Sequence, residues 1–178
     1  RGFWSPWLER IRGQGRACLA LNLEPVLASI DAYVPLVEAA VQRVTQATGV
    51  PPVLVCHSMG GLAARAWLRS CGDARRVARV VTIGSPHHGT WLARWSHAPN
   101  GRQMRLRSDW LAQLQLDEAV RVLPPFTCWY SNSDNVVFPA STATLAGADN
   151  RLVTGVPHVA LAFHGEVMRA SLAKISAL

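Results

Sequence analysis

Short apolar runs and longer amphipathic stretches alternate along the whole chain. The apolar runs cover residues 17–23, 53–56, 77–83, 127–130 and 151–154. Between the first two runs, apolar residues recur with helical spacing over residues 30–48. Strands that alternate with helices predict an α/β domain whose sheet is mostly parallel and flanked by helices.

Prolines and glycines mark the ends of the expected helices. Ser5 and Pro6 are expected to be the N-cap and the first residue of a short helix near the start of the chain. Gly72 is expected to end the helix that follows the second apolar run. A last helix is expected over residues 163–175, and residues 90–125 predict one or two helices without a strand.

The second apolar run ends in a sharp turn that contains a serine. Residues 53–56 are apolar on both faces, as expected of a central parallel strand, and Ser58 follows them before a helical pattern begins. A serine at such a turn projects its hydroxyl from the sheet, and small residues two positions away, here Cys56 and Gly60, avoid a collision across the turn. We therefore expect Ser58 to be a nucleophile and the Met59 amide to stabilise an oxyanion.

This segment resembles the nucleophile elbow of bacterial lipases and esterases of the α/β-hydrolase family. The family usually has G-x-S-x-G, and Cys56 stands here in place of the first glycine. The resemblance implies the α/β-hydrolase fold and a triad in the chain order serine, acid, histidine, with no metal or organic cofactor. Two alternatives remain for these residues: a serine that only caps a helix, or Cys56 as the nucleophile, although Cys56 lies on the strand rather than at the turn.

Asp134 has the setting expected of the triad acid. Residues 128–139 run from an apolar strand into a polar turn and resemble the family pattern S-x-x-D-x-x-V-x-P. The turn would place the carboxylate at the carboxyl edge of the sheet, while Asp109, Asp117 and Asp149 lack this strand-then-loop setting. An aspartate that only stabilises an Asx turn is the alternative.

His158 has the setting expected of the base. It follows the last apolar run, precedes the last helix and lies 24 residues beyond Asp134. An imidazole there can contact the serine hydroxyl through one nitrogen and the acid through the other. We expect His57, His87 and His88 to line the pocket, because the last two belong to a segment that resembles the family's T-P-H-x-G-T loop.

Composition favours a single packed domain. Hydrophobic residues make up 49% of the chain and charged residues 16%. The formal charge of +7 comes from 17 arginines and one lysine against 11 acidic residues. The arginines are spread through helical patterns without a nucleic-acid-binding motif, so we expect solvated helix faces and no nucleic-acid partner.

The sequence decides neither the disulfide state of the cysteines nor the cellular compartment of the protein. Cys18, Cys56, Cys71 and Cys128 show neither a close pair nor metal-ligand spacing, so their disulfide state is undecided. These residues show no signal peptide and no apolar stretch of the ~20 residues that a membrane span needs. The family resemblance is compatible with a secreted or cell-envelope protein.

The resemblance also implies that the domain over residues 1–178 is partial and lacks its N-terminal strands. If the helix at Ser5 is the first helix of the fold, the strand before it lies upstream of Arg1 and would fit between residues 17–23 and 53–56. The second oxyanion donor would then lie upstream of or near Arg1. We expect the chain alone to be unstable or to aggregate, because open strand edges and apolar faces would be exposed.

Taken together, these residues predict a carboxylic ester hydrolase that forms an acyl-enzyme, with lipid or acyl esters preferred over small soluble ones. Residues 90–125 are expected to form either a lid with an apolar underside at a lipid interface or a plain helical cap on the core. An acyltransferase or thioesterase with the same triad, and a non-catalytic fragment of such a fold, remain as alternatives.

Overall fold

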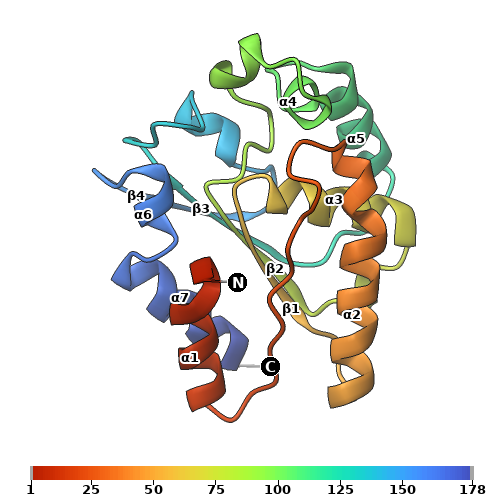
Figure 1. The fold of residues 1–178 in the computed structure, drawn as a ribbon, viewed down its shortest axis with the longest axis vertical. Helices are drawn as coiled ribbons and strands as arrows, with labels where there is room; N and C mark the ends of the chain where they lie inside the picture. Colours follow the sequence, from red (N-terminus) through yellow and green to blue (C-terminus); the bar gives the residue numbers. More distant parts are fainter. Residues whose placement is uncertain (1, 177–178) are drawn as a thin grey trace.

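Four parallel strands form the sheet of the computed structural model, which describes residues 2–176 (Figure 1). In chain order and in spatial order they are β1 (Val53–His57), β2 (Arg79–Ile83), β3 (Phe126–Ser131) and β4 (Asp149–Val153). Every neighbouring pair is parallel, with Val55 opposite Val81 in the first pair. Parallel neighbours require crossover connections, and the predicted α/β class is therefore confirmed.

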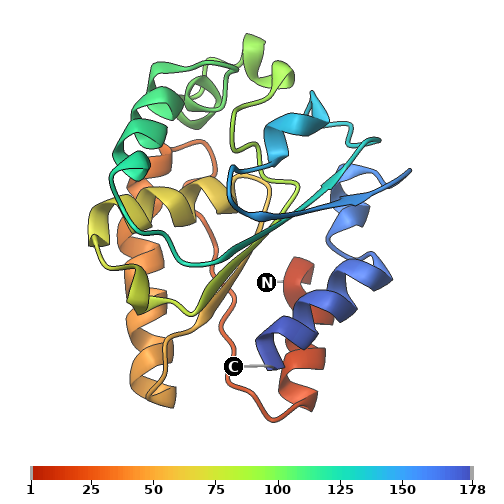
Figure 2. The same cartoon turned by 180° about the vertical axis from the view of Figure 1, so that it is seen from behind.

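Helices cover both faces of this sheet (Figures 1 and 2). One face carries α2 (Val34–Thr48), α3 (Gly60–Cys71) and α5 (Asp109–Ala119), and the other carries α1 (Ser5–Gly13), α6 (His158–Leu161) and α7 (Gly165–Ser176). The shorter elements are η1 (Gly2–Trp4), η2 (Ile30–Tyr33), η3 (Ala74–Arg76), η4 (Trp91–Trp95), α4 (Pro99–Gln103) and η5 (Ala140–Ala143). Strand residues alternate between two cores: Val80 packs with α2 and α3, whereas Val81 packs with α1 and α7.

The beginning of the described chain packs against its end. Figures 1 and 2 both show α1 beside α7, and the indole of Trp7 donates a hydrogen bond of 2.8 Å to the carbonyl of Ala162. The predicted start of α1 needs a small correction. Trp4 is the N-cap and has no side-chain cap, so Ser5 is already helical and Pro6 is the second helical residue, where its missing N–H costs nothing.

Two predicted helices are interrupted. The helix expected over residues 30–48 begins as η2 and becomes α-helical only at Val34, because Pro35 has no N–H to continue an earlier helix and instead occupies the first turn of α2. The helix expected over residues 163–175 is preceded by α6 and starts at Gly165. Both differences concern boundaries, and the elements themselves are confirmed.

The prediction of a strand over residues 17–23 is wrong. These residues are without strand pairing, and an apolar cavity of about 1210 Å³ lies between them and β1. A strand exists only where a neighbour completes its backbone hydrogen bonds, and no described residue does so here. For the same reason β1 is an edge strand within residues 2–176, with all five residues half-buried, and not the central strand that its composition predicts.

Residues 90–125 contain no strand, as predicted, and form η4, α4 and α5. Leu111 and Leu114 of α5 are buried, and Leu111 belongs to the core beside α3. Three exposed apolar side chains of the region, Trp91, Leu92 and Trp95, belong to η4, and three more, Leu116, Val120 and Val122, lie in α5 or just after it. Within residues 2–176, none of the helices has both the length and the apolar character that crossing a bilayer requires.

Candidate active site

Ser58 occupies a strained turn between β1 and α3. Its backbone φ is +54°, which is rare for a residue with a side chain and costs roughly 1–2 kcal/mol. The turn is fixed from both sides, because the Ser58 amide donates to the carbonyl of Ile83 at 3.0 Å and the Ser58 carbonyl accepts from the Gly61 amide at 3.2 Å. A strained serine between a strand and a helix is the geometry of a nucleophile elbow.

Small residues allow this turn to close. A Cβ on Gly60 would lie 3.6 Å from the Cβ of Cys56, an ordinary contact, so a cysteine fits where the family pattern has glycine. A Cβ on Gly61 would lie only 2.7 Å from the Cβ of Ser85, so this position needs glycine. Burial raises the pKa of the Cys56 thiol to about 12, which keeps it protonated and argues against Cys56 as a nucleophile.

Asp134 lies in the turn that follows β3. One carboxylate oxygen accepts hydrogen bonds from the amides of Val136 and Val137, both at 2.8 Å, and the other oxygen lies 2.8 Å from Nδ1 of His158. Burial opposes ionisation, but these hydrogen bonds outweigh it and lower the pKa of Asp134. The aspartate therefore forms an Asx turn and contacts His158 with the same carboxylate.

Hydrogen bonds join the loop of the acid to the loop of the histidine. The Asn132 side chain accepts from the Gly155 amide at 3.0 Å, and Ser131 Oγ accepts from the Val156 amide at 3.3 Å. Asn135 Oδ1 accepts from the amide of His158 itself at 3.1 Å. Sequence reasoning missed Asn135, since its position next to Asp134 gives no sign that it reaches a residue in another loop.

Gly84, at the end of β2, gives the Asp134–His158 pair room. Its φ is +58°, and a Cβ there would lie 3.1 Å from His158 Nδ1 and 3.2 Å from an Asp134 carboxylate oxygen. The residue before it, Ile83, accepts the hydrogen bond from the Ser58 amide. Ser58, Asp134 and His158 follow the ends of β1, β3 and β4, which lie at one edge of the parallel sheet, although no hydrogen bond within residues 2–176 joins the Ser58 hydroxyl to His158.

The three histidines expected near the pocket occupy different surroundings. His57 packs against His158 with ring centroids 4.6 Å apart and borders the cavity of about 1210 Å³. His87 is fully buried, with Nε2 at 3.0 Å from the Thr82 hydroxyl, and burial is the main reason that its pKa is far below the usual value. His88 is half-buried and faces a second cavity.

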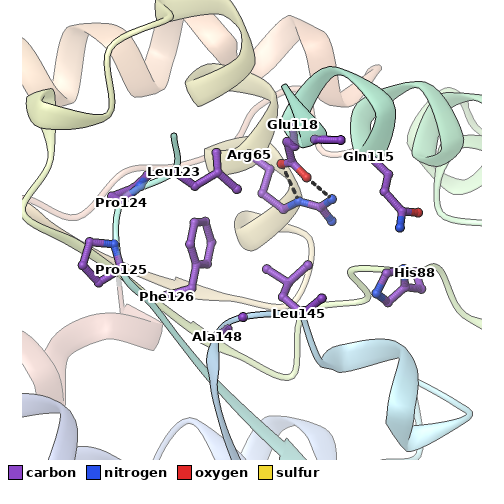
Figure 3. A pocket seen from close by; sticks show the side chains of 13 residues that line it. Arg65, His88, Gln115, Glu118, Leu123, Pro124, Pro125, Phe126, Leu145 and Ala148 are labelled. Carbon is purple, nitrogen blue, oxygen red and sulfur yellow. Dashed lines mark hydrogen bonds and ion pairs between the residues drawn. The ribbon is translucent and has the colours of Figure 1, made fainter. Parts of the chain in front are cut away.

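That second cavity, of about 460 Å³, lies on the α3–α5 side of the sheet (Figure 3). Figure 3 shows Arg65 paired with Glu118 at its wall, through two hydrogen bonds of 2.8 and 2.6 Å. The remaining guanidinium nitrogen donates to the carbonyl of His87 at 2.8 Å. This buried ion pair fixes the segment after β2, and neither cavity is lined by Ser58, Asp134 or His158.

The amide of Met59, the predicted oxyanion donor, lies at the start of α3. Met59 is the N-cap of α3, and its amide has no hydrogen-bond acceptor among the described residues, so it is free to bind a ligand atom beside Ser58. The second predicted donor, upstream of or near Arg1, lies outside the described residues. The ring of Phe3 packs against that of His57 with centroids 5.0 Å apart, so η1 approaches the turn at Ser58.

The part of the chain that the structure describes holds no cluster of three or more metal-binding side chains. Its four cysteines are unpaired in residues 2–176.

The fold is that of the α/β-hydrolases. The mature lipase BlEst2 of Bacillus licheniformis superposes with a TM-score of 0.73 at 15% identity, over 83% of this chain and 75% of that protein. A monoacylglycerol lipase of Paleococcus ferrophilus superposes with a TM-score of 0.72 at 14% identity, over 99% of this chain and 89% of that protein. Lipase B of Aspergillus fumigatus superposes with a TM-score of 0.69 at 16% identity, over 84% of this chain but 42% of its own length. At these identities the likeness establishes the fold.

The chain belongs to the palmitoyl protein thioesterase family, whose model matches residues 20–116, more than half of its length. The matched residues include Ser58 and Met59 and end before Asp134 and His158. No curated protein sequence matches this chain.

Proposed function

We propose that this protein is a serine hydrolase that cleaves acyl esters through a covalent acyl-enzyme, with Ser58, His158 and Asp134 as its triad. The observation that carries the proposal is the strained turn at Ser58, with φ +54°, next to an Asp134–His158 contact of 2.8 Å. A serine that only capped a helix would need neither the strain nor the pair. The lipase fold and the thioesterase family support the same reaction class.

The reaction follows from the protonation states of the pair. An ionised Asp134 accepts a hydrogen bond from Nδ1–H of His158, so the neutral imidazole has no proton on Nε2, and this nitrogen is able to act as the base. Ser58 Oγ attacks the substrate carbonyl carbon while its proton moves to Nε2. The tetrahedral intermediate expels an alcohol or a thiol, which receives that proton, and water then attacks the acyl-enzyme in the same manner.

The oxyanion of each intermediate is bound by the Met59 amide. This amide lies at the N-terminus of α3, where the helix dipole favours negative charge. A single missing donor in such a site costs on the order of 100- to 1000-fold in kcat. The second donor is therefore important for the turnover of this protein.

The family and the structural neighbours favour a lipid-like acyl group. The family name refers to palmitoyl thioesters, and all three of the neighbours described above are named lipases. Esters and thioesters share the acyl-enzyme and differ only in the group that leaves. We therefore propose long-chain acyl esters or thioesters as substrates, with a thioesterase as the second candidate because of the family match.

The exposed aromatic residues of η4 suit a lipid surface. Trp91 and Trp95 are exposed, and the guanidinium of Arg94 lies between them, 5.7 and 4.7 Å from the two rings. The amide of Trp91 donates to the carbonyl of Phe138, another exposed aromatic residue, in the segment that follows Asp134. Aromatic side chains beside arginine are typical of membrane-interface contacts. Whether residues 90–125 move as a lid stays a prediction.

A fluorophosphonate probe tests the nucleophile without assuming a substrate. We expect the purified protein to be labelled at Ser58, and the Ser58→Ala variant to remain unlabelled. Ser141→Ala, which removes an exposed hydroxyl elsewhere, is the control and should label like the wild type. A folded wild-type protein that resists the probe would refute the proposed reaction.

Matched substrates then test the preferred acyl group and compare the two kinds of leaving group. Butyryl and palmitoyl esters are compared with thioesters of the same acyl groups, and we expect kcat/KM to be higher for palmitoyl. Equal or higher values for butyryl substrates would refute the lipid-like acyl group. An acyltransferase would instead transfer the acyl group to an added alcohol in preference to water.

A further inference from the structure

His57 has a defined place beside the site but no step in the proposed reaction. Alternate residues of a strand face opposite sides of a sheet, so His57 shares its face with Val53 and Val55, which pack toward α1 and α7. Its ring is enclosed by two others, with Phe3 at 5.0 Å and His158 at 4.6 Å between centroids. The imidazole therefore fills the space between η1 and α6.

His57 also forms a hydrogen bond with His158. Its Nε2 lies 3.2 Å from the backbone carbonyl oxygen of His158. A carbonyl oxygen only accepts, so Nε2–H must be the donor and His57 must be the tautomer with its proton on Nε2. In a longer helix that carbonyl would accept from Ala162, but α6 tightens and the Ala162 amide bonds to Val159 at 3.3 Å instead.

His158 is thus held at three points from two parts of the fold, the loop after β3 and the end of β1. Asn135 accepts from its amide, Asp134 contacts its ring nitrogen, and His57 donates to its carbonyl. The first two partners come from the loop after β3, which fixes one side of the residue. His57 is the partner that ties His158 to the end of β1, the strand that leads directly into Ser58.

The charge state of His57 fits this place. Burial, and secondly the neighbouring His158, lower the pKa of His57 to about 4, while the hydrogen bond to the His158 carbonyl and the Asp134 carboxylate oppose the shift. His57 is therefore uncharged at neutral pH. An uncharged ring does not repel the imidazolium that His158 becomes when it takes the proton from Ser58. A lysine or arginine at position 57 would repel it.

We propose that His57 is a positioning residue that couples His158 to the nucleophile turn by donating Nε2–H to the carbonyl of His158. The inference rests on the proposed function, since it assigns His57 a part in the proton transfer from Ser58. Coupling through β1 means that the base and the nucleophile are both held at the same strand end, which restrains the distance between them.

Two variants of matched shape separate the hydrogen bond from the volume of the side chain. His57→Gln keeps an N–H donor close to the position of Nε2, whereas His57→Met has a similar length and no donor. We expect His57→Met to lose about tenfold in kcat and in the rate of fluorophosphonate labelling, with KM nearly unchanged, and His57→Gln to stay within about threefold of the wild type. His97→Phe, at an exposed histidine, is the control.

Thermal unfolding of the two variants is measured alongside, and equal Tm values are expected. If His57→Met is as fast as the wild type, or if both variants are slowed equally, the positioning role is wrong while labelling at Ser58 leaves the proposed function standing. If the folded wild type is not labelled at all, the proposed function fails and this inference fails with it. Rescue by Gln alone, with a change in kcat and not in KM, supports the proposal.

Discussion

Replacing Gly84 by alanine would test the geometry of the site most directly. The added Cβ would lie 3.1 Å from His158 Nδ1 and 3.2 Å from an Asp134 carboxylate oxygen, so the pair must retreat by a few tenths of an ångström. An alanine at φ +58° also carries a backbone penalty of roughly 1–2 kcal/mol. Gly84→Ala should therefore affect both stability and activity, and the two effects need to be separated.

Gly147→Ala is the matched control. Gly147 has φ +75° and nothing within 4 Å of its would-be Cβ, so alanine there pays the backbone penalty without crowding any side chain. Both variants should lower Tm by about 2–8 °C, which is the shift that 1–2 kcal/mol produces in a domain of this size. Only Gly84→Ala should move the Asp134–His158 pair.

The rate of fluorophosphonate labelling reads out that movement. Because a misplacement of about 1 Å can cost roughly 100-fold in rate, a shift of a few tenths of an ångström should slow Gly84→Ala by about tenfold relative to Gly147→Ala. The rates are compared at a temperature where both variants are fully folded. Equal labelling rates for the two variants would refute the reasoning, because the pair would then tolerate the extra methyl group without consequence.

Three further predictions concern stability. Hydrogen bonds from Arg76 and from Trp67 lower the pKa of Glu38 from 4.5 to about 2, so its stabilisation is complete above about pH 4.5 and is lost as the pH falls toward 2. The carboxylate is partly exposed, so we expect its ionised form to contribute about 1–2 kcal/mol to the free energy of unfolding. Urea unfolding of Glu38→Gln should therefore depend less on pH below pH 4.5 than that of the wild type. The same pH profile for both proteins would contradict this prediction. Glu118→Ala should lower the free energy of unfolding by about 3–5 kcal/mol because it leaves the buried Arg65 unpaired. The double variant Glu118→Ala with Arg65→Met should recover much of this loss. Equal stability of the single and the double variant would contradict a stabilising role of the ion pair. Finally, light scattering of the 178-residue chain should show association through the open edge of β1, whereas a monodisperse chain with a sharp melt would contradict that expectation.

Much of the fold was predictable because its signals are local. Apolar runs and helical spacing depend on adjacent residues, and all four strands and the main helices lie close to the predicted positions. The exceptions depend on the surroundings of a segment. Residues 17–23 have the composition of a strand, but no described segment pairs with them. Pro35 shifts the start of α2, which an apolar periodicity does not register.

The residues of the candidate site also differ in whether their signals are local in the sequence. The turn at Ser58 is encoded in consecutive residues, so it was predictable, and the family match covers it. Asp134 and His158 were predictable from their positions after strands, and their contact in the structure agrees with that prediction without testing their roles. Gly84 and Asn135 were not predictable, because each acts on a residue that is distant in sequence, and neither carries a motif.

β1 shows most clearly why composition alone does not settle burial. Its Val53, Leu54 and Val55 are as apolar as the residues of β2, yet all of β1 is half-buried whereas four of the five residues of β2 are buried. The difference arises because β2 has a paired strand on each side, while β1 has one paired strand and a cavity of about 1210 Å³. An apolar pattern on both faces reports how much surface a strand is able to bury, and the neighbours of the strand determine how much it does bury. Since β1 leads directly into Ser58, the packing of this edge also bears on the turn at Ser58, and His57, the last residue of β1, connects that edge to His158.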